Sequence, residues 1–146
     1  MISMSAGPAL ADTNILVYAF DTRDPEKRER AADLLANCWR GGERLSVSVQ
    51  NLAEFSVVVT EKTENQIPLP VIRKFIAAVL AYDGWNVIGY NAETILAAHD
   101  LKKRCALHFW DALLAATMNE NGISTIYTED RHFEKVPGLT VINPFG

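Results

Sequence analysis

Four acidic residues occupy positions where an α/β domain gathers its functional side chains. Asp12 follows a short apolar segment, Glu54 lies about one and a half helical turns past a second one, Asp111 begins an apolar helix, and Asp130 follows a later apolar segment. Carboxylates that converge raise each other's pKa, so they seldom gather without a cation. Oxygen ligands of this kind suit Mg²⁺ or Mn²⁺, with the remaining positions filled by water and substrate phosphate. The set predicts a divalent metal site.

Each acid also has an ordinary structural explanation when it is taken alone. Asp12 can end a strand or cap a helix, and Glu54 can be a solvated helix residue. Asp111 can pair with the positive end of its helix, although the apolar residues at 110 and 112–114 predict a largely buried helix there. Asp130 can be a loop residue. Only the order and context of the four together favour a site.

The elements that position these acids alternate along the chain, with short apolar segments between longer helical ones. This alternation is typical of a parallel sheet flanked by helices. We expect strands ending at residue 11 and over 44–48, 85–89, 124–127 and 139–142. We expect helices opening at residue 25, after Ser48 and near residue 69, then over 92–105 and 109–121. Residues 15–20 fit either an extension of the first strand or a helix capped by Asn14.

The predicted fold class is α/β, with a doubly wound, mostly parallel sheet of four to five strands and a single domain over residues 1–146. In such sheets, ligands bind at the carboxyl ends of the strands, where the strand order reverses. The helix near residue 69 is expected to bury its face with Val71, Phe75, Ala78 and Val79.

The composition is that of a globular domain, with 146 residues, 49% hydrophobic and 22% charged. No apolar stretch approaches the roughly 20 residues that cross a bilayer, and residues 1–8 lack the pattern of a secretion signal. Two cysteines are too few for a disulfide framework. We therefore expect a cytoplasmic protein without a membrane partner. The net charge of −4 argues against sequence-blind coating of DNA.

Four short motifs extend the argument to a known family. They are Asp-Thr-Asn at 12–14, Ala-Glu-Phe at 53–55, Phe-Trp-Asp-Ala-Leu at 109–113 and Thr-Glu-Asp-Arg-His-Phe at 128–133. In this order they resemble PIN-domain nucleases, and most closely the VapC-type toxins of bacterial toxin–antitoxin pairs. Residues 133–139 and 141–144 are also similar to that family, so the resemblance covers residues 10–144.

The resemblance implies a site and a reaction. Asp12 and Asp111 would bind Mg²⁺ or Mn²⁺ directly, and Glu54 and Asp130 would complete the acidic pocket as catalytic residues. Small polar residues would orient these carboxylates through hydrogen bonds, namely Thr13, Asn14 and Thr128. Glu129 departs from the pattern by adding a second acid; we expect it to face solvent, but which of the two is the fourth acid stays open. The implied reaction is metal-dependent hydrolysis of RNA phosphodiester bonds.

The resemblance also implies partners, and two other functions stay open. The partners would be an RNA substrate, with tRNA among the candidates, a VapB-type antitoxin and a second copy of this chain. The alternatives are an inactive PIN-like binding module and, less favoured, a phosphatase or receiver-like domain. A haloacid-dehalogenase phosphatase would need an acid where this chain has Asn14.

Several other polar and aromatic residues are left outside the predicted site. The three histidines lack metal-ligand spacing and are expected to be surface or partly buried residues, with His108 and His132 candidates for the pocket rim. The basic residues at 102–104 and 73–74 are expected to be solvated helix faces, with an RNA-backbone track as the alternative. Trp110 is expected to be a core or dimer contact.

Overall fold

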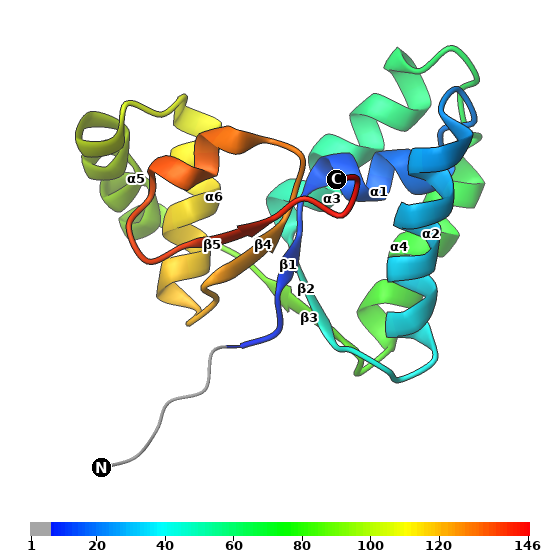
Figure 1. The fold of residues 1–146 in the computed structure, drawn as a ribbon, viewed down its shortest axis with the longest axis horizontal. Coiled ribbons are helices and arrows are strands. Elements are labelled where there is room, and N and C mark those ends of the chain that lie inside the picture. The colour runs from blue at the N-terminus through cyan, green and yellow to red at the C-terminus, as the bar shows by residue number, and fades with distance from the viewer. Residues whose placement is uncertain (1–6) are drawn as a thin grey trace.

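The computed structural model describes residues 7–146, which form a five-stranded sheet with every pairing parallel (Figure 1). The strand order is β3-β2-β1-β4-β5. The strands are β1 (Leu10–Ala11), β2 (Leu45–Ser48), β3 (Trp85–Ile88), β4 (Thr125–Tyr127) and β5 (Thr140–Ile142). The predicted α/β class and doubly wound sheet are confirmed. Residues 1–6, which belong to the segment considered for a secretion signal, lie outside the described residues.

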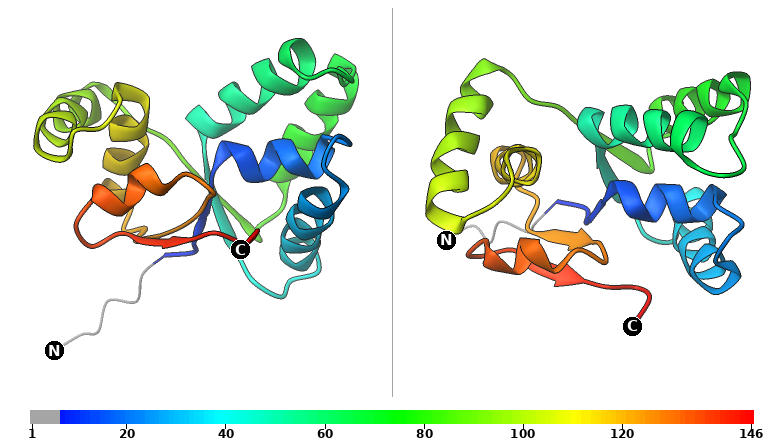
Figure 2. Two further views of the ribbon diagram at one scale, coloured as in Figure 1. Left: turned by 45° about the horizontal axis from the view of Figure 1, so that its top comes forward. Right: turned by 90° about the horizontal axis from the view of Figure 1, so that it is seen from above.

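In the described part of the chain, six α-helices flank the sheet, together with one π-helix and one 3-10 helix. They are α1 (Thr13–Phe20), α2 (Pro25–Trp39), α3 (Val49–Val57), π-helix η1 (Val58–Lys62), α4 (Leu69–Ala81), α5 (Ala92–Cys105), α6 (Phe109–Glu120) and 3-10 helix η2 (Arg131–Lys135). Figures 1 and 2 show α1–α4 gathered on one side of the sheet and α5 and α6 on the other. No helix within residues 7–146 is long and apolar enough to cross a membrane.

The two layers of helices use opposite faces of the same strands. Ala11 of β1 packs with the core of α1–α4, while its neighbour Leu10 packs with the α6 side around Leu114 and Ile126. Both residues of β1 are fully buried. This follows from the alternation of side chains along a strand covered on both faces, and it explains why the first strand reads as a short apolar run without a polar face.

The chain builds the sheet outward from β1, first on one side of this strand and then on the other. It runs outward through β2 to β3, then returns through α5 and α6 to place β4 against the free side of β1. Strand order therefore reverses beside β1, and this is the point where parallel sheets of this kind leave a crevice at their carboxyl edge. Asp12 stands directly at that edge.

The helix starts follow their capping residues. Asp24 accepts a hydrogen bond from the Lys27 amide and precedes Pro25 at the start of α2, and Ser48 caps α3 as expected. The ambiguous residues 15–20 form helix α1, and its cap is Asp12 rather than Asn14. A strand is impossible there because the chain must leave the sheet where Asp12 ends β1.

The buried face of α4 differs from the prediction. Ile72 and Val79 are buried, whereas Val71 and Ala78 are exposed. The predicted set combined two adjacent stripes of a helix that is apolar almost all round, so hydrophobicity alone did not fix its rotation. The exposed Leu69 and Leu80 belong to the same helix.

Candidate active site

Asp12 is the most enclosed acid of the predicted site, with 8% of its surface exposed. It ends β1 and caps α1, so its Oδ1 accepts a hydrogen bond of 2.8 Å from the Thr13 amide. Its Oδ2 accepts one of 2.8 Å from the Thr128 hydroxyl, which follows β4. Burial raises the pKa of Asp12 to about 6, because the two hydrogen bonds offset only part of the desolvation and nearby acids add to the rise.

Two side-chain amides complete the surroundings of Asp12. Asn14 Nδ2 lies 3.3 Å from Asp12 Oδ2 and 3.0 Å from the Thr128 hydroxyl. Asn51 Nδ2 lies 3.3 Å from Asp12 Oδ1 and 3.0 Å from the Thr13 hydroxyl. The carboxylate is therefore oriented by uncharged donors from the starts of α1 and α3 and the end of β4.

Asn51 was missed by the sequence analysis as a partner of Asp12. It is fully buried and forms a capping box with Ser48, in which Asn51 Oδ1 accepts from the Ser48 amide and hydroxyl. The signal that indicates it is the spacing of Ser48 and Asn51 at the start of a helix leaving the same sheet edge. Its amide group then points at Asp12 because α3 begins beside α1.

Glu54 and Asp111 join Asp12 around one cleft of about 370 Å³. Glu54 projects from α3, and Asp111 lies in the first turn of α6 on the opposite side. Loss of solvent raises the pKa of Glu54, to which the Asp111 charge adds. The pKa of Asp111 is raised by its partial burial and then by the Asp130 charge. Acids from three separate elements thus share one cleft.

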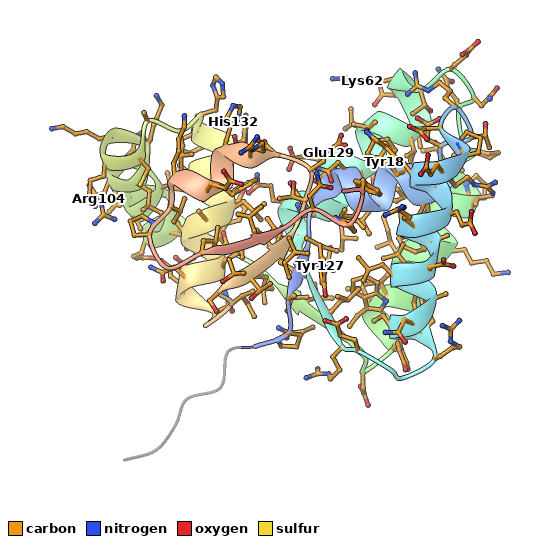
Figure 3. The ribbon with its side chains drawn as sticks, viewed as in Figure 1. Tyr18, Lys62, Arg104, Tyr127, Glu129 and His132 are labelled. Carbon is orange, nitrogen blue, oxygen red and sulfur yellow. The ribbon has the colours of Figure 1, made fainter. Side chains whose placement is uncertain are left out.

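Asp130 lies beside Asp111 and outside the residues that line this cleft. It caps η2, and its Oδ1 accepts a hydrogen bond of 2.8 Å from the His132 amide. The His132 Nδ1 atom is 3.1 Å from Asp130 Oδ1 and 3.9 Å from Asp111 Oδ2. Figure 3 labels His132 at the start of the short helix after β4. The structure therefore places Asp111 between the cleft and the Asp130–His132 pair.

His132 is exposed at the surface, as expected, and its imidazole lies directly beside two of the acids. Ligand atoms of Asp111, Asp130 and His132 all lie within 4.8 Å of one another, a spacing that one metal ion can bridge. The sequence does not predict this grouping, because the three residues belong to two separate elements and form no regularly spaced motif. The 3-10 turn after Asp130 brings the imidazole back over it.

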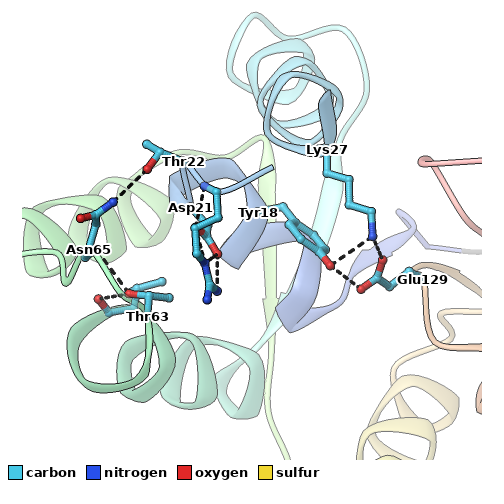
Figure 4. Close-up of polar contacts among 9 residues, drawn as sticks. Tyr18, Asp21, Thr22, Lys27, Thr63, Asn65 and Glu129 are labelled. Atoms are coloured by element: carbon cyan, nitrogen blue, oxygen red, sulfur yellow. Dashed lines mark hydrogen bonds and ion pairs between the residues drawn. The ribbon is translucent and has the colours of Figure 1, made fainter. Parts of the chain in front are cut away.

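Glu129 does not face open solvent as expected. Its carboxylate accepts a hydrogen bond of 2.6 Å from the Tyr18 hydroxyl and pairs with Lys27 Nζ at 2.9 Å (Figure 4). Burial alone would raise the pKa of Glu129, but these two partners lower it below its usual value. Lys27 also lies over the Tyr18 ring, 4.9 Å from its centroid. Glu129 thus ties the loop after β4 to α1 and α2, while Asp130 faces Asp111.

The donor set fits a hard divalent cation. Within residues 7–146, no Lys or Arg forms an ion pair with Asp12, Glu54, Asp111 or Asp130. Carboxylates that gather without such a partner are electrostatically incomplete, as the raised pKa values of Asp12, Glu54 and Asp111 indicate, and a divalent ion supplies the missing charge. Asp12 already accepts four hydrogen bonds, so direct ligation would replace one of the two 3.3 Å amide contacts.

Trp110 does not lie in the core, one of the two positions expected for it, and the dimer contact stays a prediction. Trp110 is 59% exposed, although the seven residues that follow Asp111 in α6 are nearly or fully buried. Its carbonyl oxygen accepts a hydrogen bond of 2.9 Å from Gln50 Nε2, which joins the starts of α3 and α6 at the cleft. This contact fixes the distance between the two helices that carry Glu54 and Asp111.

Three solved structures show the same fold at low sequence identity. They are VapC20 of Mycobacterium tuberculosis, described as a sarcin-ricin loop cleaving toxin, the VapBC2 complex of Rickettsia felis bound to a promoter DNA fragment, and FitAcB of Neisseria gonorrhoeae. VapC20 has a TM-score of 0.65 and 18% identity, covering 86% of this chain and 92% of its own. The values for VapBC2 are 0.61 and 18%, covering 92% and 97%. Those for FitAcB are 0.66 and 15%, covering 94% and 98%.

No curated protein matches the sequence. The family model of the PIN domain, however, matches residues 9–139, a span from the residue before β1 to the residue before β5. This span contains all four acids of the site and the strand-order reversal that brings them together. The match in sequence agrees with the likeness in fold, and the chain belongs to the PIN domain family.

Proposed function

We propose that this chain is a metal-dependent endoribonuclease and the toxin of a type II toxin–antitoxin pair, built as a single PIN domain over residues 1–146. The observation that supports this most directly is the cleft shared by Asp12, Glu54 and Asp111, with no basic partner among the described residues. Membership of the PIN family and the likeness to toxin–antitoxin structures add to it.

Asp12 and Asp111 would hold Mg²⁺ or Mn²⁺, and Glu54 and Asp130 would complete the site. When bound, the metal would polarise the scissile phosphate and acidify an attacking water. Asp12 contributes a carboxylate whose direction is set by its hydrogen bonds from the Thr13 amide and the Thr128 hydroxyl, so it is oriented before substrate binds. Glu54, with its raised pKa and open position in the cleft, is suited to accept the proton that the water loses.

The proposed partners are RNA, a VapB-type antitoxin and a second copy of this chain in the cytoplasm. Among the structures of similar fold, one from Klebsiella pneumoniae is a toxin–antitoxin complex, and VapBC2 and FitAB were each solved with a bound DNA fragment. The net charge of −4 and the acidic cleft suit a basic antitoxin segment. Among RNA classes, tRNA is one candidate.

The deciding experiment is cleavage of a mixed cellular RNA pool by the purified chain. Reactions contain Mn²⁺, Mg²⁺ or EDTA, and the Asp12→Asn variant serves as the control for contaminating nucleases. Metal-dependent cutting that disappears in the variant supports the proposal and yields products from which the target can be mapped. Absence of cutting with either metal, combined with Mn²⁺ binding undetectable by calorimetry, would favour the inactive binding module.

A further inference from the structure

A second hollow, of about 340 Å³, adjoins the acids on the side away from the main cleft. Its lining combines four basic side chains with a small apolar floor, namely Lys102, His108, His132 and Lys135 with Ala106 and Leu107. No acidic residue lines it. In a chain with a net charge of −4, a hollow lined only by basic and apolar residues is a marked local reversal of charge.

The hollow has a defined frame. Helix α5 ends at Cys105, the C-cap residue Ala106 adopts a left-handed backbone with φ of 53°, and Leu107 is buried directly after it. Lys135, the last residue of η2, donates a hydrogen bond of 3.2 Å to the Ala106 carbonyl oxygen and so joins η2 to the end of α5. Helix α6 begins at the next turn with no side-chain cap at His108. Its first amide groups therefore leave a positive end beside the hollow.

His132 connects the hollow to the acids. Its ring lines the hollow, while its Nδ1 atom lies 3.1 Å from Asp130 and 3.9 Å from Asp111. The His108 and His132 ring centroids are 6.1 Å apart. A group seated in the hollow is therefore separated from the acidic site by one imidazole ring.

The basic residues at 102–104 project from α5 toward different parts of the surface. Lys102 faces the hollow, whereas Arg104 lines a different depression with Val136 and Leu139. Figure 3 shows Arg104 and His132 on separate parts of the surface. Of the three basic residues at 102–104, Lys102 alone is in the lining of the hollow, and the sequence by itself does not predict which of the three lies there.

We propose that this hollow binds a backbone phosphate of the RNA next to the phosphodiester that is cut. This rests on the proposed nuclease function and adds where the substrate is held. Two ammonium groups, two imidazoles and an uncapped helix start are donors that favour a phosphate over a neutral or cationic group. A cluster of acids repels a polyanion, so a positive subsite at its side holds the strand in place and fixes which way it crosses the cleft.

The test measures RNA binding separately from cleavage. A fluorescein-labelled, mixed-sequence single-stranded RNA is titrated with the Asp12→Asn chain, and anisotropy gives Kd over a series of KCl concentrations. In that background, Lys102→Gln with Lys135→Gln removes both ammonium groups from the hollow. The matched control, Lys103→Gln with Arg104→Gln, removes the same amount of charge from α5 at positions that do not line the hollow. All four residues are exposed, so the fold is retained, and circular dichroism checks this.

We expect the hollow variant to bind RNA roughly tenfold more weakly at low salt, with a slope of log Kd against log salt about 0.7 smaller, the value for one phosphate on a single strand. The control should change Kd less than twofold. Equal effects of the two variants would overturn the inference in favour of diffuse attraction. An unchanged Kd or slope would also overturn it.

The two proposals can fail separately. If the natural chain cuts RNA but the hollow variant binds as tightly as its background, only the phosphate site is wrong. If the natural chain cuts no RNA under any metal and the hollow variant still loses affinity, the nuclease proposal fails while the phosphate site stands. Lys102→Arg with Lys135→Arg should restore binding, because arginine keeps the charge and the donors.

Discussion

Asp12 carries an electrostatic cost in the metal-free protein. It is almost fully enclosed, its partners are uncharged, and its pKa is raised from 3.8 to about 6. An acid whose pKa is higher in the fold than in the unfolded chain stabilises the fold at low pH, and this contribution is lost as the pH rises through the folded value. Enclosure thus makes ionised Asp12 a destabilising group until a cation joins it.

The first prediction is a pH dependence of stability that belongs to Asp12. With EDTA present, we expect the natural chain to lose on the order of 3 kcal/mol relative to Asp12→Asn between pH 4 and pH 7, since the pKa is raised from 3.8 to about 6. Urea unfolding of both proteins across this range measures the difference. If the difference in unfolding free energy between the two proteins did not change with pH, burial would not be raising the pKa of Asp12.

The second prediction separates the two neighbouring acids after β4. Asp130→Asn should lower RNA cleavage by at least about tenfold, because Asp130 lies beside Asp111 and faces the site. Glu129→Gln should change cleavage only a few-fold, because its carboxylate is engaged by Tyr18 and Lys27. Initial rates on one mapped RNA substrate give the comparison. The opposite ranking would identify Glu129 as the fourth acid.

The acids could be predicted from the sequence because each follows an apolar segment at the edge of the sheet. Their neighbours could not be predicted as completely. The Asn51 amide reaches Asp12 from another helix, and a 3-10 turn brings His132 to Asp130. Glu129 accepts a hydrogen bond from Tyr18, which is far away in sequence. Position along an element is encoded locally, whereas the direction of a side chain across a cleft depends on packing.

At the scale of elements, the start of α3 does two tasks with one residue. Asn51 closes the capping box with Ser48 and also donates to Asp12 and Thr13. Helix α5 has an equivalent capping box, formed by Asn91 and Thr94, and it lies away from the acids. The two capping boxes can therefore be compared, because the one in α3 contacts Asp12 and the one in α5 does not.

The third prediction uses this pair. Asn51→Ala and Thr94→Ala should each lower the free energy of unfolding by about 1–3 kcal/mol, because each breaks a cap and leaves buried partners unpaired. Only Asn51→Ala should also weaken Mn²⁺ binding, measured by calorimetry. Equal weakening by both variants would mean that loss of stability alone, and not the Asp12 contact, controls the metal site.

Element positions were predictable where caps and breakers were explicit. Ser48, the Asp24–Pro25 pair and the glycines after α2 and α6 marked helix ends within a residue or two. Residues 15–20 stayed ambiguous because they are apolar throughout, and only the cap at Asp12 decides for a helix. The π-helix η1 had no signal beyond the β-branched run at 57–59, which disfavours regular helix.

At the scale of the whole molecule, the strand order decides which acids meet. Asp12 and Glu54 belong to the half built on β1 and β2, and Asp111 and Asp130 to the half that returns to β4. The four are joined only because β4 pairs with β1. A metal bound among them therefore connects both halves of the sheet.

The fourth prediction follows from that connection. Mn²⁺ should raise the melting temperature of the entire cooperative transition, with about 2.7 kcal/mol of stabilisation at a hundred times its Kd. Asp111→Asn should abolish most of the shift while leaving the metal-free melting temperature within a few degrees. Scanning calorimetry with and without Mn²⁺ measures both. A melting temperature indifferent to Mn²⁺ would contradict a metal site.

The pairing of β4 with β1 also has a consequence for the order in which the protein is made. Asp12 leaves the ribosome 116 residues before Thr128, and β4 must pair with the first strand before Thr128 can reach Asp12. A domain generally folds as a unit during synthesis. A nascent chain of this protein therefore has no assembled acidic site until β4 and the residues directly after it have emerged and β4 has paired with β1.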